Sequence, residues 1–84
     1  MTDSPTEDSR KAAGLLVLTR RGELGLTQQE TARRAGVNVD TLSDMENGKS
    51  WPWPRNVAAI ARVLGLDAAE LQRIASGLPA QAAS

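Results

Sequence analysis

The sequence predicts an all-α fold, a compact bundle of five short helices, from three observations. Apolar residues recur at helical intervals, most clearly at Val57, Ile60, Ala61 and Leu64. No four-residue stretch alternates apolar and polar residues in the β-branched manner of a strand. Capping residues and glycines divide the chain into short segments. A length of 84 residues allows one small domain.

The first helix is expected from near Asp8 to Gly22. Ser4 and Pro5 offer an earlier start, because serine is a good N-cap and proline is favoured at the first helical position. Gly14 interrupts this helix and costs it about 1 kcal/mol against alanine.

The chain is expected to form one domain between two tails. Residues 1–9 carry three acidic side chains and no basic one, and we expect a flexible tail there. Residues 10–78 form the predicted domain, and residues 79–84 are expected to fray.

The second and third helices have clear boundaries in the sequence. Thr27 and Glu30 form the pattern of a capping box, in which each side chain bonds the backbone of the other residue. Gly36 suits the left-handed conformation that ends a helix. Only three residues separate this helix from the third, which is expected over about 39–47 with Asn38 as its N-cap.

A stiff Trp-Pro-Trp-Pro segment at residues 51–54 precedes the fourth helix, which should end at Gly65. Asp67 and Glu70 suggest a second capping box at the start of the fifth helix. Core and dimer contacts are expected from that helix's apolar residues, which are Leu71, Ile74, Ala75 and Leu78.

The composition argues against several functional classes. The chain has no Cys and no His, which removes disulfides, Cys/His zinc sites and most nucleophile–base catalysis. No cofactor motif or metal cluster is apparent, so we expect no enzyme, no cofactor and no small-molecule ligand. The longest apolar run, residues 15–18, is too short to span a bilayer, and the acidic N-terminus differs from a secretory signal. A cytoplasmic protein without membrane contact is therefore expected.

Ten basic and ten acidic side chains cancel, but they are unevenly placed. Residues 10–62 carry nine cations and five anions, whereas residues 1–9 are purely acidic and residues 63–84 carry one cation and two anions. A zero mean charge is therefore compatible with a basic surface formed by the middle of the chain.

Two short helices joined by a tight glycine-containing turn have the geometry of a helix-turn-helix. The segments Leu26–Ala32, Gly36–Val37 and Met45–Lys49 resemble the Cro/C1-type (XRE-like) helix-turn-helix domain of phage and bacterial repressors. The resemblance covers about residues 12–75. It implies the lambda repressor-like fold of five helices with a central helix-turn-helix. It also implies a sequence-specific DNA-binding transcriptional regulator in the bacterial cytoplasm or nucleoid, encoded by a phage or its host.

The resemblance further implies the partners and the site residues. The partners are double-stranded operator DNA and a second copy, joined through the C-terminal helix or on DNA. Helix 39–47 would enter the major groove and face base edges with Val39, Asp40, Thr41, Ser43 and Asp44. Phosphates would be contacted by Thr27, Gln28, Asn38, Asn47, Lys49 and Ser50. A buried ion pair of Arg21 and Glu46 would join the first and third helices.

Two features depart from the family pattern. Asp40 and Asp44 stand where the family commonly has Gln, Asn, Ser, Thr or Arg. A carboxylate can accept from cytosine N4, but it is repelled by phosphates. The two acids therefore either read bases, or only neutralise the face or cap the start of the third helix. Trp51 and Trp53 lie in a loop about one residue longer than expected. At least one ring should pack in the core, and an exposed ring would contact DNA or a partner subunit.

The acidic helix leaves a second function open. A protein-interaction module on the same fold, antitoxin-like or anti-repressor, would use this helix against a basic partner and bind DNA weakly or not at all.

Overall fold

The computed structural model describes residues 5–77, and within that range the chain forms five α-helices and no strand. The all-α prediction is therefore confirmed. No helix in this part of the chain is long and apolar enough to cross a membrane. The helices are α1 (Pro5–Glu23), α2 (Gln28–Ala35), α3 (Val39–Asn47), α4 (Pro54–Leu64) and α5 (Ala68–Ala75).

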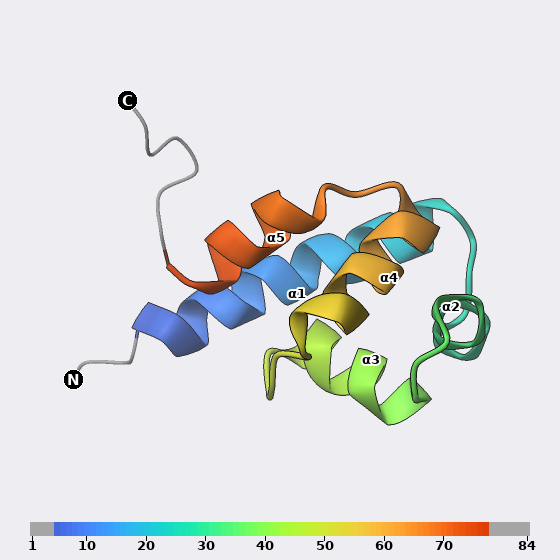
Figure 1. Ribbon diagram of the computed structural model, residues 1–84, viewed down its shortest axis with the longest axis horizontal. Coiled ribbons are helices and arrows are strands. Elements are labelled where there is room, and N and C mark those ends of the chain that lie inside the picture. Colours follow the sequence, from blue (N-terminus) through green and yellow to red (C-terminus); the bar gives the residue numbers. More distant parts are fainter. Residues whose placement is uncertain (1–4, 78–84) are drawn as a thin grey trace.

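The longest helix, α1, runs through the middle of the bundle (Figure 1). It packs against α3 and α5 and also contacts α4, while α2 packs against α3 and α4. In Figure 1, α2 is seen nearly end-on whereas α3 lies across the view, so these two consecutive helices are steeply inclined to each other. This is the arrangement of a helix-turn-helix.

The core is a single cluster of buried apolar side chains to which every helix contributes. The four apolar residues predicted to share one face of α4 are all buried. Because the cluster contains no fully buried aromatic ring, small and medium side chains must interlock closely. Its members are Ala13, Val17, Ala32, Leu42, Met45, Val57, Ile60, Ala61, Leu64, Leu71 and Ala75.

Local capping fixes the boundaries of α2 and α3. Thr27 Oγ1 accepts from the Glu30 backbone N–H at 2.9 Å, and Glu30 Oε1 accepts from the Thr27 backbone N–H at 3.5 Å. Gly36 ends α2 with a φ of 72°. Asn38 Oδ1 then accepts from the Asp40 backbone N–H at 2.8 Å and starts α3. The expected capping box and N-cap are both present.

The start of α1 differs from the main expectation. The helix begins at Pro5, the earlier of the two offered starts, rather than near Asp8, so residues 5–9 belong to α1. Glu7 and Asp8 in the first turn interact favourably with the helix dipole. The end of α5 lies close by, since a Cβ atom on Gly77 would come 3.1 Å from Ser9 Oγ. The suggested N-cap Ser4, Leu78 and the tail at residues 79–84 lie outside the described residues.

The second predicted capping box forms only in part. Asp67 Oδ1 accepts from the backbone N–H groups of Ala69 and Glu70 at 2.9 and 3.3 Å. The Glu70 carboxylate does not return the bond, because it pairs with Arg73 Nη2 at 3.0 Å, one turn along the helix.

Two glycines allow α1 and α3 to approach closely. Gly14 is buried, and a Cβ atom there would collide with the Met45 carbonyl oxygen and lie 2.9 Å from that of Glu46. Gly48 has a φ of 73°, and a Cβ atom there would collide with the side chain of Lys11. The end of α3 is therefore held directly against the α1 backbone.

Candidate nucleic-acid interface

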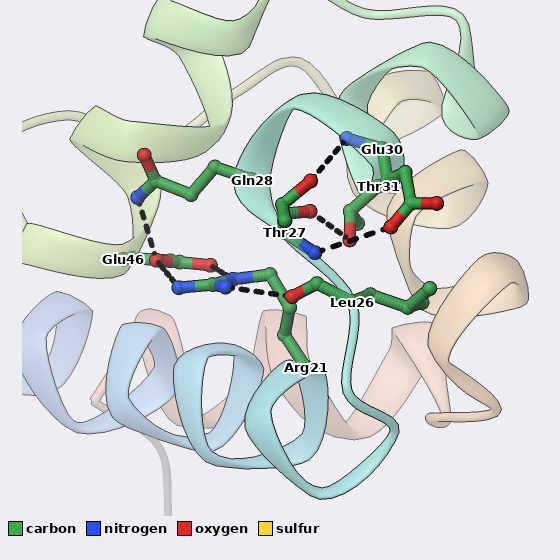
Figure 2. A network of polar contacts seen from close by, with 7 residues as sticks. All are labelled: Arg21, Leu26, Thr27, Gln28, Glu30, Thr31 and Glu46. Carbon is green, nitrogen blue, oxygen red and sulfur yellow. Dashed lines mark hydrogen bonds and ion pairs between the residues drawn. The ribbon is translucent and has the colours of Figure 1, made fainter.

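A buried carboxylate lies where α1, α2 and α3 meet (Figure 2). The Glu46 side chain is 0% exposed. Arg21 Nε donates to Glu46 Oε2 at 2.6 Å, and Arg21 Nη2 donates to Oε1 at 3.0 Å. Gln28 Nε2 donates to the same Oε1 atom at 2.9 Å. One carboxylate thus joins side chains from three helices.

Arg21 also binds the loop that leads into α2. Its Nη1 donates to the Leu26 carbonyl oxygen at 2.8 Å, which positions the residue immediately before the α2 N-cap. The hydrogen bond and charge of Glu46 raise the pKa of Arg21, while partial burial opposes this rise. Arginine is protonated at all ordinary pH values, and this shift reinforces that state, so Arg21 always presents its donors to Glu46 in the charged form.

The N-terminal end of α2 presents backbone donors. The first N–H groups of a helix have no intrahelical acceptor, and the helix dipole favours an anion there. The Thr27 hydroxyl oxygen accepts from the Glu30 backbone N–H, which does not use the O–H donor of Thr27. Gln28 keeps a second amide N–H and its amide oxygen beyond the bond to Glu46. The bond from Gln28 to Glu46 was not predicted, because no local pattern places these residues together.

The outer face of α3 carries the five residues expected to read bases. Asp40 is exposed, and the other four, Val39, Thr41, Ser43 and Asp44, are half-buried. The opposite face is buried in the core and the junction through Leu42, Met45 and Glu46. Within the described residues 5–77, neither Asp40 nor Asp44 has an ion-pair partner. The outer face of α3 is therefore polar and acidic.

The other predicted phosphate contacts lie at the two ends of α3. Asn47, Lys49 and Ser50 are exposed after the helix, where the Lys49 backbone N–H donates to the Asp44 carbonyl oxygen at 2.9 Å. Asn38 is exposed before it, although its side-chain oxygen is engaged in capping. The structure therefore places these residues at the start and end of α3, with the α2 N-terminus linked to the same helix through Glu46.

The two tryptophans have different environments. Trp51 is half-buried against the core, and its Nε1 donates to Gln72 Oε1 on α5 at 2.9 Å. Trp53 is 76% exposed. The expectation that at least one ring packs on the core is right, whereas the bond to Gln72 had no signal in the sequence.

Comparison with known proteins identifies the same motif. A family model described as helix-turn-helix matches residues 17–71. The chain is 36% identical over 64 residues to an HTH-type transcriptional regulator of Sinorhizobium fredii, covering 76% of this chain and 83% of that protein. It is 44% identical over 50 residues to another from Methanothermobacter thermautotrophicus, covering 60% and 72%.

A phage protein and a solved structure are also similar. The ImmF control region 10 kDa protein of Bacillus phage phi105 is 37% identical over 57 residues, which are 68% of this chain. This chain spans only 63% of that protein's length. The crystal structure of the clp gene regulator ClgR from Corynebacterium glutamicum superposes with a TM-score of 0.69 and 28% identity, covering 82% of this chain and 73% of ClgR.

Proposed function

Because the chain belongs to the helix-turn-helix family, in its Cro/C1 type, we propose that it is a sequence-specific DNA-binding regulator that inserts α3 into the major groove of an operator. The junction at Glu46 is the observation that carries this proposal. It ties the start of α2, through Gln28, to α3 and α1. Because α2 and α3 are held in a fixed relative position, the N-terminus of α2 can bind a phosphate while α3 reads the bases.

In this proposal the outer face of α3 reads the base edges. Asp40 and Asp44 accept from cytosine N4, while Val39 and the Thr41 methyl group contact thymine methyl groups. The Ser43 hydroxyl can donate a hydrogen bond to a base edge or accept one from it. The phosphate-binding residues are Thr27, Gln28, Asn38, Asn47, Lys49 and Ser50. The family's members are DNA-binding regulators, and the proposal includes no catalytic step.

The proposed partners are double-stranded DNA and a second copy of the chain. Two copies would occupy a near-palindromic operator with half-sites about one helical turn apart, joined through the C-terminal helix or on the DNA itself. The protein would act in the cytoplasm or nucleoid, where its operator is accessible.

Selection from a random duplex pool, followed by fluorescence anisotropy with the enriched site, tests this function. We expect one enriched motif and an affinity that falls steeply with added salt. Lys49→Ala should weaken binding to all duplexes and reduce the salt slope by about one. Arg62→Ala is the charge-matched control, since Arg62 is exposed in the last turn of α4. A pool that enriches no motif would contradict sequence-specific binding.

The unpaired Asp40 and Asp44 favour a second candidate, a protein-interaction module on the same fold. Such a module would present its acidic α3 to a basic protein surface. Absence of duplex binding even at low salt, together with capture of a basic partner that is lost in Asp40→Asn, would support this candidate over the first.

A further inference from the structure

The segment between α3 and α4 projects from the bundle beside the end of α3 (Figure 1). Its two tryptophans are the only aromatic residues of the chain. Trp51 is fixed by its bond to Gln72 and by the core, whereas Trp53 is the most exposed large hydrophobic residue among those described. An exposed tryptophan carries a large apolar ring with a polar N–H at one edge, a combination that suits contact with a partner that is partly apolar and partly polar.

The exposed ring is held by a stiff backbone. Pro52 and Pro54 fix their own φ angles and restrict the residue before each to extended conformations. Trp53 has φ −60° and ψ 151°, close to polyproline II, in which residues two apart point in different directions. Its carbonyl oxygen accepts from the backbone N–H groups of Asn56 and Val57 at 2.9 and 3.0 Å. Binding through Trp53 would therefore order little additional backbone.

The chain on either side of Trp53 carries only positive charges. Residues 47–66 include three cations and no acidic residue. Lys49 and Arg55, which flank Trp53 on either side, are both exposed. The stem of Lys11, from α1, lies against Gly48 at the end of α3. An apolar ring between two cations is complementary to the backbone of DNA, in which apolar sugars alternate with anionic phosphates.

We propose that Trp53, flanked by Lys49 and Arg55, packs against the deoxyribose–phosphate backbone of duplex DNA next to the groove occupied by α3. This inference rests on the proposed function. The cations pair with phosphates, and the indole face covers the sugar between them. The contact is independent of base sequence, and it offsets the repulsion between phosphates and the two aspartates of α3.

Tryptophan fluorescence tests the contact directly. In Trp51→Phe, Trp53 is the only fluorophore, and duplex DNA should shift its emission and protect it from acrylamide quenching. In Trp53→Phe, where Trp51 reports, both effects should be small. If Trp51→Phe does not fold, acrylamide protection of the wild-type protein is compared with that of Trp53→Phe, and protection should be lost in the variant.

Affinity measurements separate this inference from the proposed function. Trp53→Ala should weaken duplex binding by about five- to tenfold without changing the selected motif, a typical loss for one aromatic contact. Trp53→Phe, which keeps a ring, should retain most of the affinity.

Equal affinity of wild type and Trp53→Ala, with Lys49→Ala still weakened, would overturn the inference and leave the proposed function standing. No duplex binding by the wild type at low salt would overturn both. Loss of self-association in Trp53→Ala with unchanged DNA affinity would also overturn the inference, because the ring would then contact protein.

Discussion

Glu46 joins the two helices of the helix-turn-helix to each other and to α1, and its hydrogen-bond partners were only partly predictable. The resemblance implied the pair with Arg21, whereas the amide bond from Gln28 depends on the distance between two helices. The outward position of Asp40 follows from helical periodicity alone, since Leu42 and Met45 must face the core. Periodicity thus predicts which side chains face outward, while the polar contacts between helices require the tertiary structure.

Arg21→Ala should destabilise the domain by roughly 2–4 kcal/mol, because it leaves a buried carboxylate with only the Gln28 bond. For a domain of this size, that change lowers the melting midpoint by roughly 10–20 °C. Thermal and urea unfolding followed by circular dichroism measure the loss. Arg33→Ala removes an exposed arginine from α2 and should leave the midpoint within about 2 °C. A midpoint for Arg21→Ala equal to this control would disprove the structural role of the pair.

Gly14→Ala should destabilise the protein although alanine is the better helix former. The added methyl group would collide with backbone carbonyls of α3, which cannot rotate away, at a cost of about 1–3 kcal/mol. Gly22→Ala is a matched control in the same helix, where a Cβ atom meets nothing within 4 Å. It should stabilise by up to about 1 kcal/mol. Urea unfolding of both variants tests the opposite signs, and stabilisation by both would contradict the close packing of α1 on α3.

At the scale of single elements, local signals predicted the helix ends well. The caps at Thr27 and Asn38 involve residues at most three apart, so the sequence contains the whole interaction. The start of α1 at Pro5 is the earlier of the two starts that the sequence offered, and it follows from the preference of proline for the first helical position. The return bond from Glu70 was predicted but is absent, since Arg73 competes for the same carboxylate.

The acidic face of α3 gives a prediction that belongs to this element. Asp40→Asn should increase affinity for duplex DNA that lacks the operator about threefold to tenfold, because it removes an unpaired charge from a surface facing phosphates. If Asp40 reads a base, selection with the variant should also change the preference at one position of the motif. Asp44→Asn should act in the same way at another position. Unchanged preference in both variants would mean that these aspartates do not read bases.

For the whole molecule, the zero net charge is an average that hides the relevant distribution. Of the cations in the middle segment, Lys49 and Arg55 are exposed on either side of the segment between α3 and α4, whereas Arg21 is paired with the buried Glu46. The fold was predictable because short-range caps and apolar spacing agree with each other. The DNA-binding surface was less predictable, because the sequence does not tell which of the nine cations between residues 10 and 62 stay free to bind phosphate.

The apolar area exposed on the surface determines whether two copies of the free protein can associate. A stable interface buries about 800 Å² on each partner. In the described part of α5, Leu71 and Ala75 are buried in the core, and the other apolar residues are the half-buried Ala68 and Ile74 and the exposed Ala69, so this helix offers little apolar area for a dimer. We therefore expect a monomer at micromolar concentration and two cooperatively bound copies on a palindromic duplex, as measured by sedimentation velocity with and without DNA. A half-site duplex should bind a single copy.

A stable free dimer would contradict this expectation. Loss of that dimer in Leu15→Glu but not in Ile74→Glu would locate the interface on α1, where Leu15 is 59% exposed.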